Sequence, residues 1–255
     1  MKRILIAICL IFACFRGFAQ TKGKATPPII TTKKVYLQYQ NQKDSLLIPV
    51  VSDDYPGLQK ALSDSVLFSG EKLQDVIDNY RKCGCGITSL NYKVEYANSR
   101  MVSIRLYYEG MGAYPSAYQT WLTLLADDGN SISLNTALGD GGTDYILQKY
   151  KQILISRINR DMTGQPRETN AVATRKELLT AVGKLKAKDI TNKFLLTPKG
   201  LLVTTDNVLP HVIQNLEPQR EVLFTMAELK KFSVAYSVEP GWHTTIKRPS
   251  PPLAH

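Results

Sequence analysis

The chain has few of the residues on which enzymes most often depend. It contains only three histidines, His211, His243 and His255, and two of its four cysteines lie in the first twenty residues. No G-x-S-x-G elbow is present for a serine nucleophile. No His, Cys and Asp side chains cluster at the spacing of a zinc site. The sequence therefore indicates no catalytic residues, no metal and no cofactor.

Long basic runs are also missing. The chain carries a net charge of +10, yet its lysines and arginines never stand more than two in a row. Nucleic-acid binding needs a basic stripe or patch, so a diffuse charge does not support it. After the first nineteen residues no apolar run is long enough to cross a membrane.

The first nineteen residues are predicted to be a signal peptide. Lys2 and Arg3 form a positive start, an apolar run follows over 4–15, and Ala19 ends a small-residue cleavage site. We therefore expect an exported protein, periplasmic or secreted. The alternative is a lipoprotein anchored through Cys14, which follows Ala13 as in a lipobox. Membrane contact is expected only in that case.

The rest of the chain is expected to form one domain between two irregular ends. Residues 20–32 are polar and contain prolines, as is typical of a flexible leader, and 237–255 form a mobile Pro-rich tail. The domain is predicted over 33–236.

Hydrophobic periodicity predicts an α+β fold. Alternation of apolar and polar residues predicts an antiparallel sheet, and a long amphipathic helix over 144–158 is expected to cover it, with further short helices and hairpins. The apolar residues of that sheet and helix should be buried together, namely Ile104, Leu106, Leu122, Ile146, Tyr150, Ile153 and Leu154. The predicted strands are 35–39, 47–50, 90–96, 102–108, 118–124, 131–134, 194–196, 201–203, 222–224 and 232–235.

Cys83 and Cys85 are separated only by Gly84. In an oxidising compartment two nearby thiols usually pair, so we expect a disulfide. A ring this small is strained, and strained disulfides are the reducible ones. The pair is either a local staple or a redox motif, and no thioredoxin-like strand and helix surround it.

Several motifs occur in the order seen in one known family. Residues 108–115, YEGMGAYP, follow a strand pair, and residues 127–134, DDGNSISL, follow the next strand. The amphipathic helix comes next, then residues 194–201, FLLTPKGL, and a closing segment 222–230, VLFTMAELK. This order resembles the extracytoplasmic RsiV/PdaC-type domain, which lysozyme-sensing anti-sigma factors share with peptidoglycan deacetylases. The resemblance extends over roughly 35–236.

The resemblance implies a binding domain of the cell envelope, with lysozyme-like proteins or cell-wall glycan as candidate ligands. It implies no activity, because the chain has no deacetylase catalytic domain. It also lacks the sigma-binding segment and spanning helix of a sigma-factor regulator.

Aromatic residues around one glycine-rich loop give the best signal for binding. Tyr107 and Trp121 lie on the less apolar phase of their strands, and Tyr114 lies between Gly110 and Gly112 on one side and Pro115 on the other. Exposed aromatic rings stack on sugars or anchor protein partners. The competing interpretation is that these rings are core and that the glycines only relieve crowding. The predicted ligand-binding residues are Tyr107, Gly110, Gly112, Tyr114 and Trp121.

Together these observations predict a non-catalytic binding module of the envelope, whose partner is an envelope protein or a glycan. The alternative is a small cell-wall hydrolase or a thiol redox protein. The absent motifs and scarce histidines favour the binding module.

Overall fold

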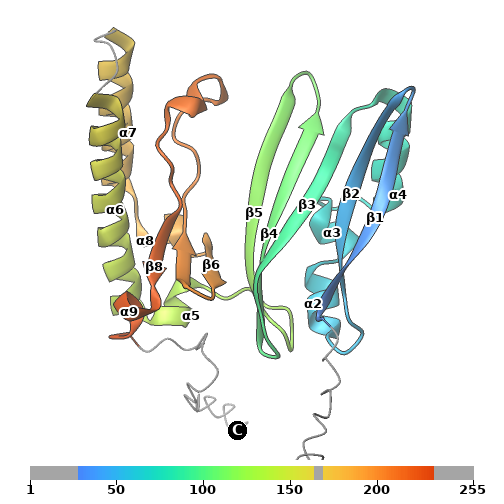
Figure 1. The fold of residues 1–255 in the computed structure, drawn as a ribbon, viewed down its shortest axis with the longest axis horizontal. Coiled ribbons are helices and arrows are strands. Elements are labelled where there is room, and N and C mark those ends of the chain that lie inside the picture. Colours follow the sequence, from blue (N-terminus) through green and yellow to red (C-terminus); the bar gives the residue numbers. More distant parts are fainter. Residues whose placement is uncertain (1–27, 164–168, 233–255) are drawn as a thin grey trace, which may run out of the picture.

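The computed structural model describes residues 28–163 and 169–232 of the chain. It shows an α+β fold with two separate sheets that lie side by side (Figure 1). The predicted signal peptide, Cys14 and the predicted tail lie outside the described residues, as does nearly all of the strand expected over 232–235. Within the described part, no helix is long and apolar enough to cross a membrane.

The larger sheet has five strands in the order β1-β2-β3-β4-β5. Neighbouring strands are antiparallel except β2 and β3, which pair in parallel over a short stretch at Ser45 and Leu46. Hairpins join β1 to β2, β3 to β4 and β4 to β5, whereas β2 and β3 are joined by a longer crossover, as parallel neighbours require. The strands are β1 (Ile30–Tyr39), β2 (Gln42–Val51), β3 (Gly86–Ala97), β4 (Met101–Met111) and β5 (Pro115–Leu125).

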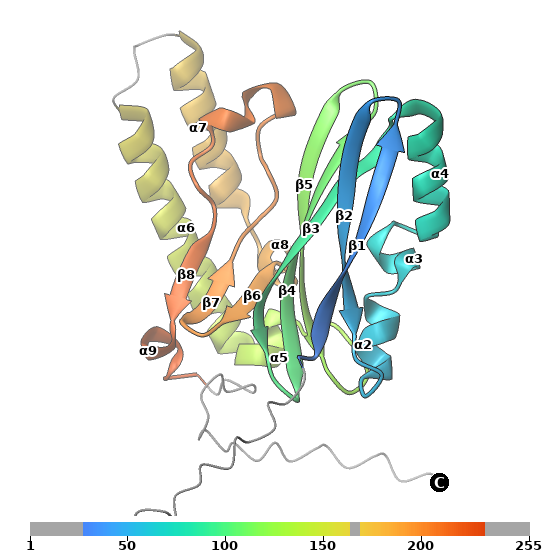
Figure 2. The same ribbon diagram turned by 45° about the vertical axis from the view of Figure 1, so that its right-hand side comes forward.

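Three short helices cover one face of the large sheet (Figure 2). They are α2 (Pro56–Ala61), α3 (Asp64–Leu67) and α4 (Leu73–Cys83). Ile104 and Leu106 of β4 point to this face and are fully buried with Leu58 and Tyr80 of the helices. This first core cluster runs in sequence from Leu37 to Ala126.

The smaller sheet has three antiparallel strands and its own helices. A second core cluster fills the space between them, with Tyr150 and Leu154 of the long helix against Phe194 and Phe224 of the sheet. The elements are α5 (Leu134–Leu138), α6 (Asp140–Thr163), α7 (Thr169–Lys184), α8 (Ala187–Ile190), β6 (Phe194–Thr197), β7 (Gly200–Val203), η2 (His211–Leu216), β8 (Val222–Thr225) and α9 (Met226–Leu229).

The prediction that the long helix over 144–158 covers the large sheet is wrong. The α+β class is confirmed, but α6 covers the small sheet, and Ile146, Tyr150 and Leu154 share no cluster with Ile104, Leu106 or Leu122. The physical reason is that α2, α3 and α4 already occupy the apolar face of the large sheet. This face can be covered by only one set of helices, and it is covered by α2, α3 and α4, which lie between β2 and β3 in the chain.

Two further expectations differ from the structure. Residues 30–32, assigned to the flexible leader, already belong to β1, where they pair with Pro49–Val51. Residues 131–134 do not form a strand, because only Ser131 bridges to Leu124, and Leu134 begins α5 with Ser133 as its N-cap. A serine in this position satisfies a free amide of the first turn and favours the helix.

Hydroxyl groups join the two sheets. On the face of the large sheet away from α2–α4, the Ser103 and Thr123 hydroxyls lie 2.9 Å apart. Thr123 donates to the carbonyl of Phe194, and the amide of Leu196 donates to the Ser103 oxygen, each at 3.0 Å. These bonds satisfy the outer edge of β6, which would otherwise leave backbone groups buried without partners.

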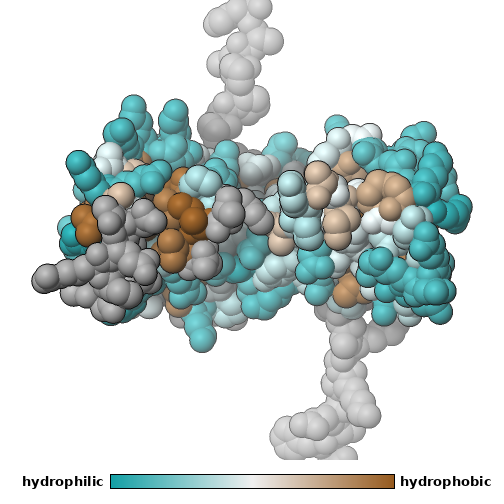
Figure 3. All heavy atoms as spheres, turned by 90° about the horizontal axis from the view of Figure 1, so that it is seen from above, coloured by the Kyte–Doolittle hydropathy of each residue, from teal (hydrophilic) through white to brown (hydrophobic). Residues whose placement is uncertain are grey.

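Hydrophilic side chains cover most of the surface seen from above, and the hydrophobic atoms there form separate patches (Figure 3). The most exposed large apolar side chain in the described residues is Tyr114, at 83%.

Candidate functional site: a cleft beside strand β5

The structure brings Tyr107 and Trp121 together around one arginine. The register of β4 and β5 sets Arg105 opposite Trp121 and Tyr107 opposite Gln119, so all four side chains share the face that looks toward the small sheet. The Arg105 guanidinium lies 4.5 Å from the centre of the Trp121 ring and 5.8 Å from that of Tyr107. Both rings are half-buried. Both rings therefore make cation–π contacts with a desolvated charge.

Arg105 also links the two halves of the molecule. It is only 7% exposed and forms an ion pair of 2.6 Å with Glu221, which precedes β8, and one of 3.5 Å with Glu95 of β3. A register shift between Val94 and Tyr96 marks a β-bulge in β3. Such a bulge inserts a residue and re-aims a side chain, and here the Glu95 carboxylate comes to lie beside Arg105.

The glycine-rich loop forms the tip of the β4–β5 hairpin, away from this cluster. Tyr114 lies there and is 83% exposed, whereas Trp121 lies farther along β5, roughly 23 Å away at about 3.3 Å per residue. Gly110 is needed for space, because a Cβ atom there would lie 3.1 Å from the Gly86 carbonyl oxygen. A Cβ on Gly112 would meet nothing within 4 Å. The five predicted residues therefore form two separate groups.

Tyr118, between these residues in β5, points to the opposite face of the sheet. Its ring stacks on Tyr108 with 4.7 Å between centroids and 8° between planes. Burial raises the pKa of the Tyr118 and Tyr108 hydroxyls, so both stay neutral at physiological pH.

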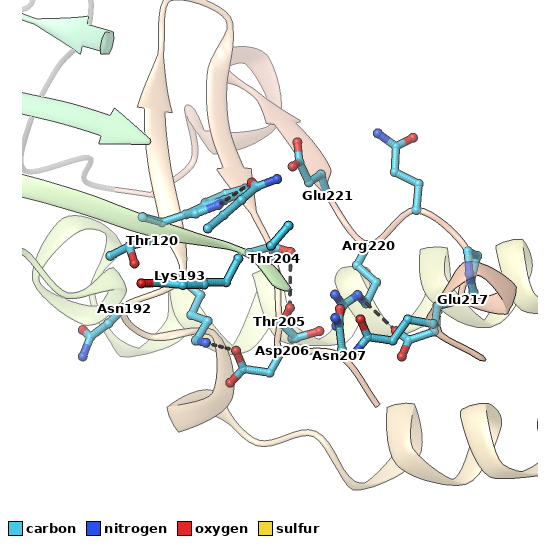
Figure 4. A pocket seen from close by; sticks show the side chains of 17 residues that line it. Thr120, Asn192, Lys193, Thr204, Thr205, Asp206, Asn207, Glu217, Arg220 and Glu221 are labelled. Atoms are coloured by element: carbon cyan, nitrogen blue, oxygen red, sulfur yellow. Dashed lines mark hydrogen bonds and ion pairs between the residues drawn. The ribbon is translucent and has the colours of Figure 1, made fainter. Parts of the chain in front are cut away.

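A cleft of about 620 Å³ lies between β5 and the segment that connects β7 to β8. Figure 4 shows its polar lining, in which hydroxyl, amide and charged side chains from both sides surround the opening. Trp121 is the largest side chain on the β5 side. Opposite it stand Lys193, Asp206, Gln214 and Arg220.

The charged side chains of the cleft are paired with one another or with Arg105. Lys193 pairs with Asp206, Arg220 pairs with Glu217 at 3.2 Å, and Glu221 pairs with Arg105. Glu217 also accepts a hydrogen bond from the amide of Val208, which fixes the far side of the cleft. The cleft therefore offers hydrogen-bonding groups without a strong field of either sign.

The long helix α6 holds the far side of the cleft in place. The Tyr150 hydroxyl donates to the Arg220 carbonyl at 2.9 Å, and Arg157 donates to the Glu221 carbonyl at 2.9 Å. Burial raises the pKa of Tyr150, which keeps its proton available for that bond. Both sides of the cleft are thus attached to packed elements.

Cys83 and Cys85 are joined by a disulfide at the end of α4. Gly84 between them adopts a left-handed φ of 63° and ends the helix. A Cβ at this position would lie 2.6 Å from the Tyr39 ring, so glycine is also required by packing. Among the described residues, no three His, Cys, Asp or Glu side chains come together as a metal site.

The sequence pointed to Trp121 and Tyr107 but missed the far side of the cleft. Residues 204–221 carry no apolar periodicity, and only long-range packing brings them opposite β5. The one signal in the sequence was Arg105, a charged residue in an otherwise β-type segment. Its burial required a partner from elsewhere in the chain.

The comparisons with known proteins give a structural likeness only. No family model and no curated protein matches the chain. A DUF3298 family protein from Pseudomonas aeruginosa aligns at 14% identity and a TM-score of 0.49, covering 80% of this chain and 92% of its own. A DUF3298 member from Bacteroides fragilis aligns at 12% identity and a TM-score of 0.45, covering 80% and 91%. At these scores the likeness assigns neither a family nor an activity to this chain.

Proposed function

We propose that the chain is a non-catalytic, exported binding module of the cell envelope and that the cleft beside β5 is its ligand site. Lysozyme-like proteins and cell-wall glycan are the candidate ligands, as the sequence resemblance implies. The observation that carries the proposal is the cleft itself: a polar opening with a half-buried tryptophan at its edge, fixed on both sides to packed elements. Such sites pair a few oriented polar groups with one apolar surface.

The acids of the cleft support binding rather than hydrolysis. Asp206, Glu217 and Glu221 each have a cationic partner. General acid–base catalysis needs a carboxyl group within hydrogen-bond reach of the substrate, and these carboxylates are already engaged by their cationic partners. The paired carboxylates are better suited to hold the cleft in shape and to accept hydrogen bonds.

The test is calorimetric titration of the protein with two probes, hen lysozyme and soluble muropeptides. At least one should bind, and Trp121→Ala should weaken that binding about tenfold or more, since a stacked ring contributes roughly 1–3 kcal/mol. Val172→Ala is the matched control, because Val172 is 66% exposed on α7, outside the cleft. Melting temperatures should confirm that both variants fold.

Tyr114→Ala decides between the two groups of predicted residues. If the cleft is the site, this variant binds normally, because Tyr114 lies at the hairpin tip. Loss of binding in Tyr114→Ala with normal binding in Trp121→Ala would move the site to the tip. Release of shortened glycan from muropeptides during the titration would favour the hydrolase alternative.

A further inference from the structure

Strand β5 has a stretch of free backbone along the cleft. The carbonyl of Thr123 accepts from Ile132 at 2.8 Å and the amide of Leu125 donates to Asn130 at 2.9 Å, so the odd-numbered residues of β5 direct their backbone groups away from β4. By this alternation Ala117, Gln119 and Trp121 also direct their N–H and C=O groups outward. In the described residues, these three residues have no backbone partner on that side.

This edge lacks the features that usually protect an edge strand. Proteins block such edges with charges, bulges, prolines or a very short strand. The strand is 11 residues long, contains no charged residue and pairs with β4 without a register shift. Its only proline, Pro115, is the first residue. The protein itself already uses the far end of this edge, where Ser131 bridges to Leu124.

We propose that an extended, uncharged peptide segment of a partner protein binds along Ala117–Trp121 and extends the large sheet by one strand. The inference rests on the proposed function, because it takes the cleft as the ligand site, and it names the ligand class. Only a polypeptide presents donors and acceptors that repeat about every 6.7 Å along an extended chain, which is the repeat of alternate residues in β5. The N-acetyl groups of cell-wall glycan also carry N–H donors, but they project from the sugar rings and do not form the alternating donors and acceptors of an extended backbone.

The lining of the cleft fits this occupant. The charged side chains of the cleft are already paired with one another or with Arg105. A charged peptide could form an ion pair there only by breaking an existing one, so an uncharged peptide fits better. On the opposite face of the sheet, an added strand would lie next to Tyr118, which is 48% exposed, and favour apolar residues at alternate positions. A second copy of this chain is a poorer fit, because its own segment 204–221 stands across its β5 edge.

The test uses a blocked heptapeptide of alternating threonine and valine as the probe. Amide hydrogen exchange should slow at Gln119 and Trp121 when the peptide is added, while the inward amides of Tyr118 and Thr120 should change little. The same peptide with an N-methyl group on every residue should give no protection, because it has no backbone N–H left to donate on either edge.

A matched pair of variants separates the backbone from the side chain. Gln119→Pro removes an outward N–H without removing a bond to β4, and edge strands tolerate proline. Gln119→Ala removes the same side-chain amide but keeps the N–H. Peptide binding should be at least tenfold weaker in Gln119→Pro than in Gln119→Ala, with similar melting temperatures in both.

Each of the following outcomes would overturn the inference. Equal binding by both variants, or protection by the N-methylated peptide, would show that the backbone edge is not used. Protection by chitohexaose but not by the peptide would leave the cleft as the ligand site with a glycan in it. Protection that rises with protein concentration alone would assign the edge to a second copy. Absence of protection with every probe would overturn the proposed function as well.

Discussion

Arg105 shows how one residue serves both the fold and the site. It carries a buried charge beside two aromatic rings and joins the large sheet to the segment before β8 through Glu221. Removing one member of a buried ion pair leaves the other charge without compensation, which is more costly than replacing both.

Replacement of Arg105 by methionine should therefore lower the free energy of unfolding by about 3 kcal/mol, measured by urea denaturation. Arg81→Met is the control, because Arg81 forms an ion pair with Asp78 at the surface, where its side chain is 67% exposed. That change should stay within about 0.5 kcal/mol. Adding Glu221→Gln to Arg105→Met should recover part of the loss; an additive second loss would contradict the pairing.

The raised pKa of the buried Tyr80 hydroxyl leads us to expect a loss of stability at alkaline pH. Burial, together with the hydrogen bond to Asp44 at 2.5 Å, raises its pKa to about 12. An unfolded tyrosine ionises near pH 10. The folded state thus holds its proton longer, and the resulting stability is complete below pH 10 and lost as pH rises toward 12.

Tyr80→Phe should cost about 1 kcal/mol at pH 8 through the lost hydrogen bond. Between pH 10 and 12 its stability should fall less steeply than that of the parent, by up to about 1.4 kcal/mol per pH unit. Denaturation at pH 8, 10 and 11 measures both effects. Parallel curves for the two proteins would show that another group controls the alkaline loss.

At the scale of elements, the small sheet depends on one glycine. Gly200 has a φ of +143°, and a Cβ atom there would lie 2.0 Å from the carbonyl oxygen of Phe224 on the neighbouring strand. Gly200 begins β7 directly opposite Thr225. A side chain at this point must force β7 and β8 apart.

Gly200→Ala should lower the unfolding free energy by about 3 kcal/mol or more, by steric strain in a backbone conformation that disfavours side chains. Gly183→Ala is the control, since Gly183 lies in α7 and a Cβ atom there would meet nothing within 4 Å. Alanine favours the helix there by about 0.5–1 kcal/mol. Thermal melts should move in opposite directions for the two variants.

The elements were more predictable than their packing. Alternation located β3, β4 and β5 and their hairpins, because residues such as Val102, Ile104 and Leu106 point to one face. The same pattern does not say which helix covers that face, and α4 took the place expected for α6. Apolar and polar residues also alternate over 131–134, but four residues are too few to decide the structure, and Ser133 instead caps helix α5.

The candidate site divides in the same way. Trp121 and Tyr107 were predicted as ligand-binding residues because they occupy the less apolar phase of their strands, and the structure places both rings beside Arg105. Their partner Arg105 was not assigned, since its burial depends on Glu221, which lies far along the chain. Periodicity is a local signal, and the cleft is formed by contacts between distant segments.

At the scale of the whole molecule, the two core clusters should behave independently. Ile104 and Leu154 lie in different clusters, separated by the hydroxyl contacts of Ser103 and Thr123. Each change to alanine should cost about 2–5 kcal/mol. The double variant should lose the sum to within about 0.5 kcal/mol in urea denaturation, and a larger coupling would show that the clusters are in contact.

The two core clusters are formed by consecutive parts of the chain, and this has a consequence for the order in which they fold during synthesis. The buried residues of the first cluster lie between Leu37 and Ala126 in the sequence. Those of the second cluster, except Met101, lie at Ile132 or beyond. A nascent or translocating chain that emerges from its N-terminus thus completes the five-stranded sheet before β6 exists. Such segments fold as units in order of emergence. Until β6 arrives, Ser103 and Thr123 lack the backbone partners of the finished protein, and Met101 lacks the second cluster in which it is buried, so the newly made half exposes both polar and apolar groups along its later seam.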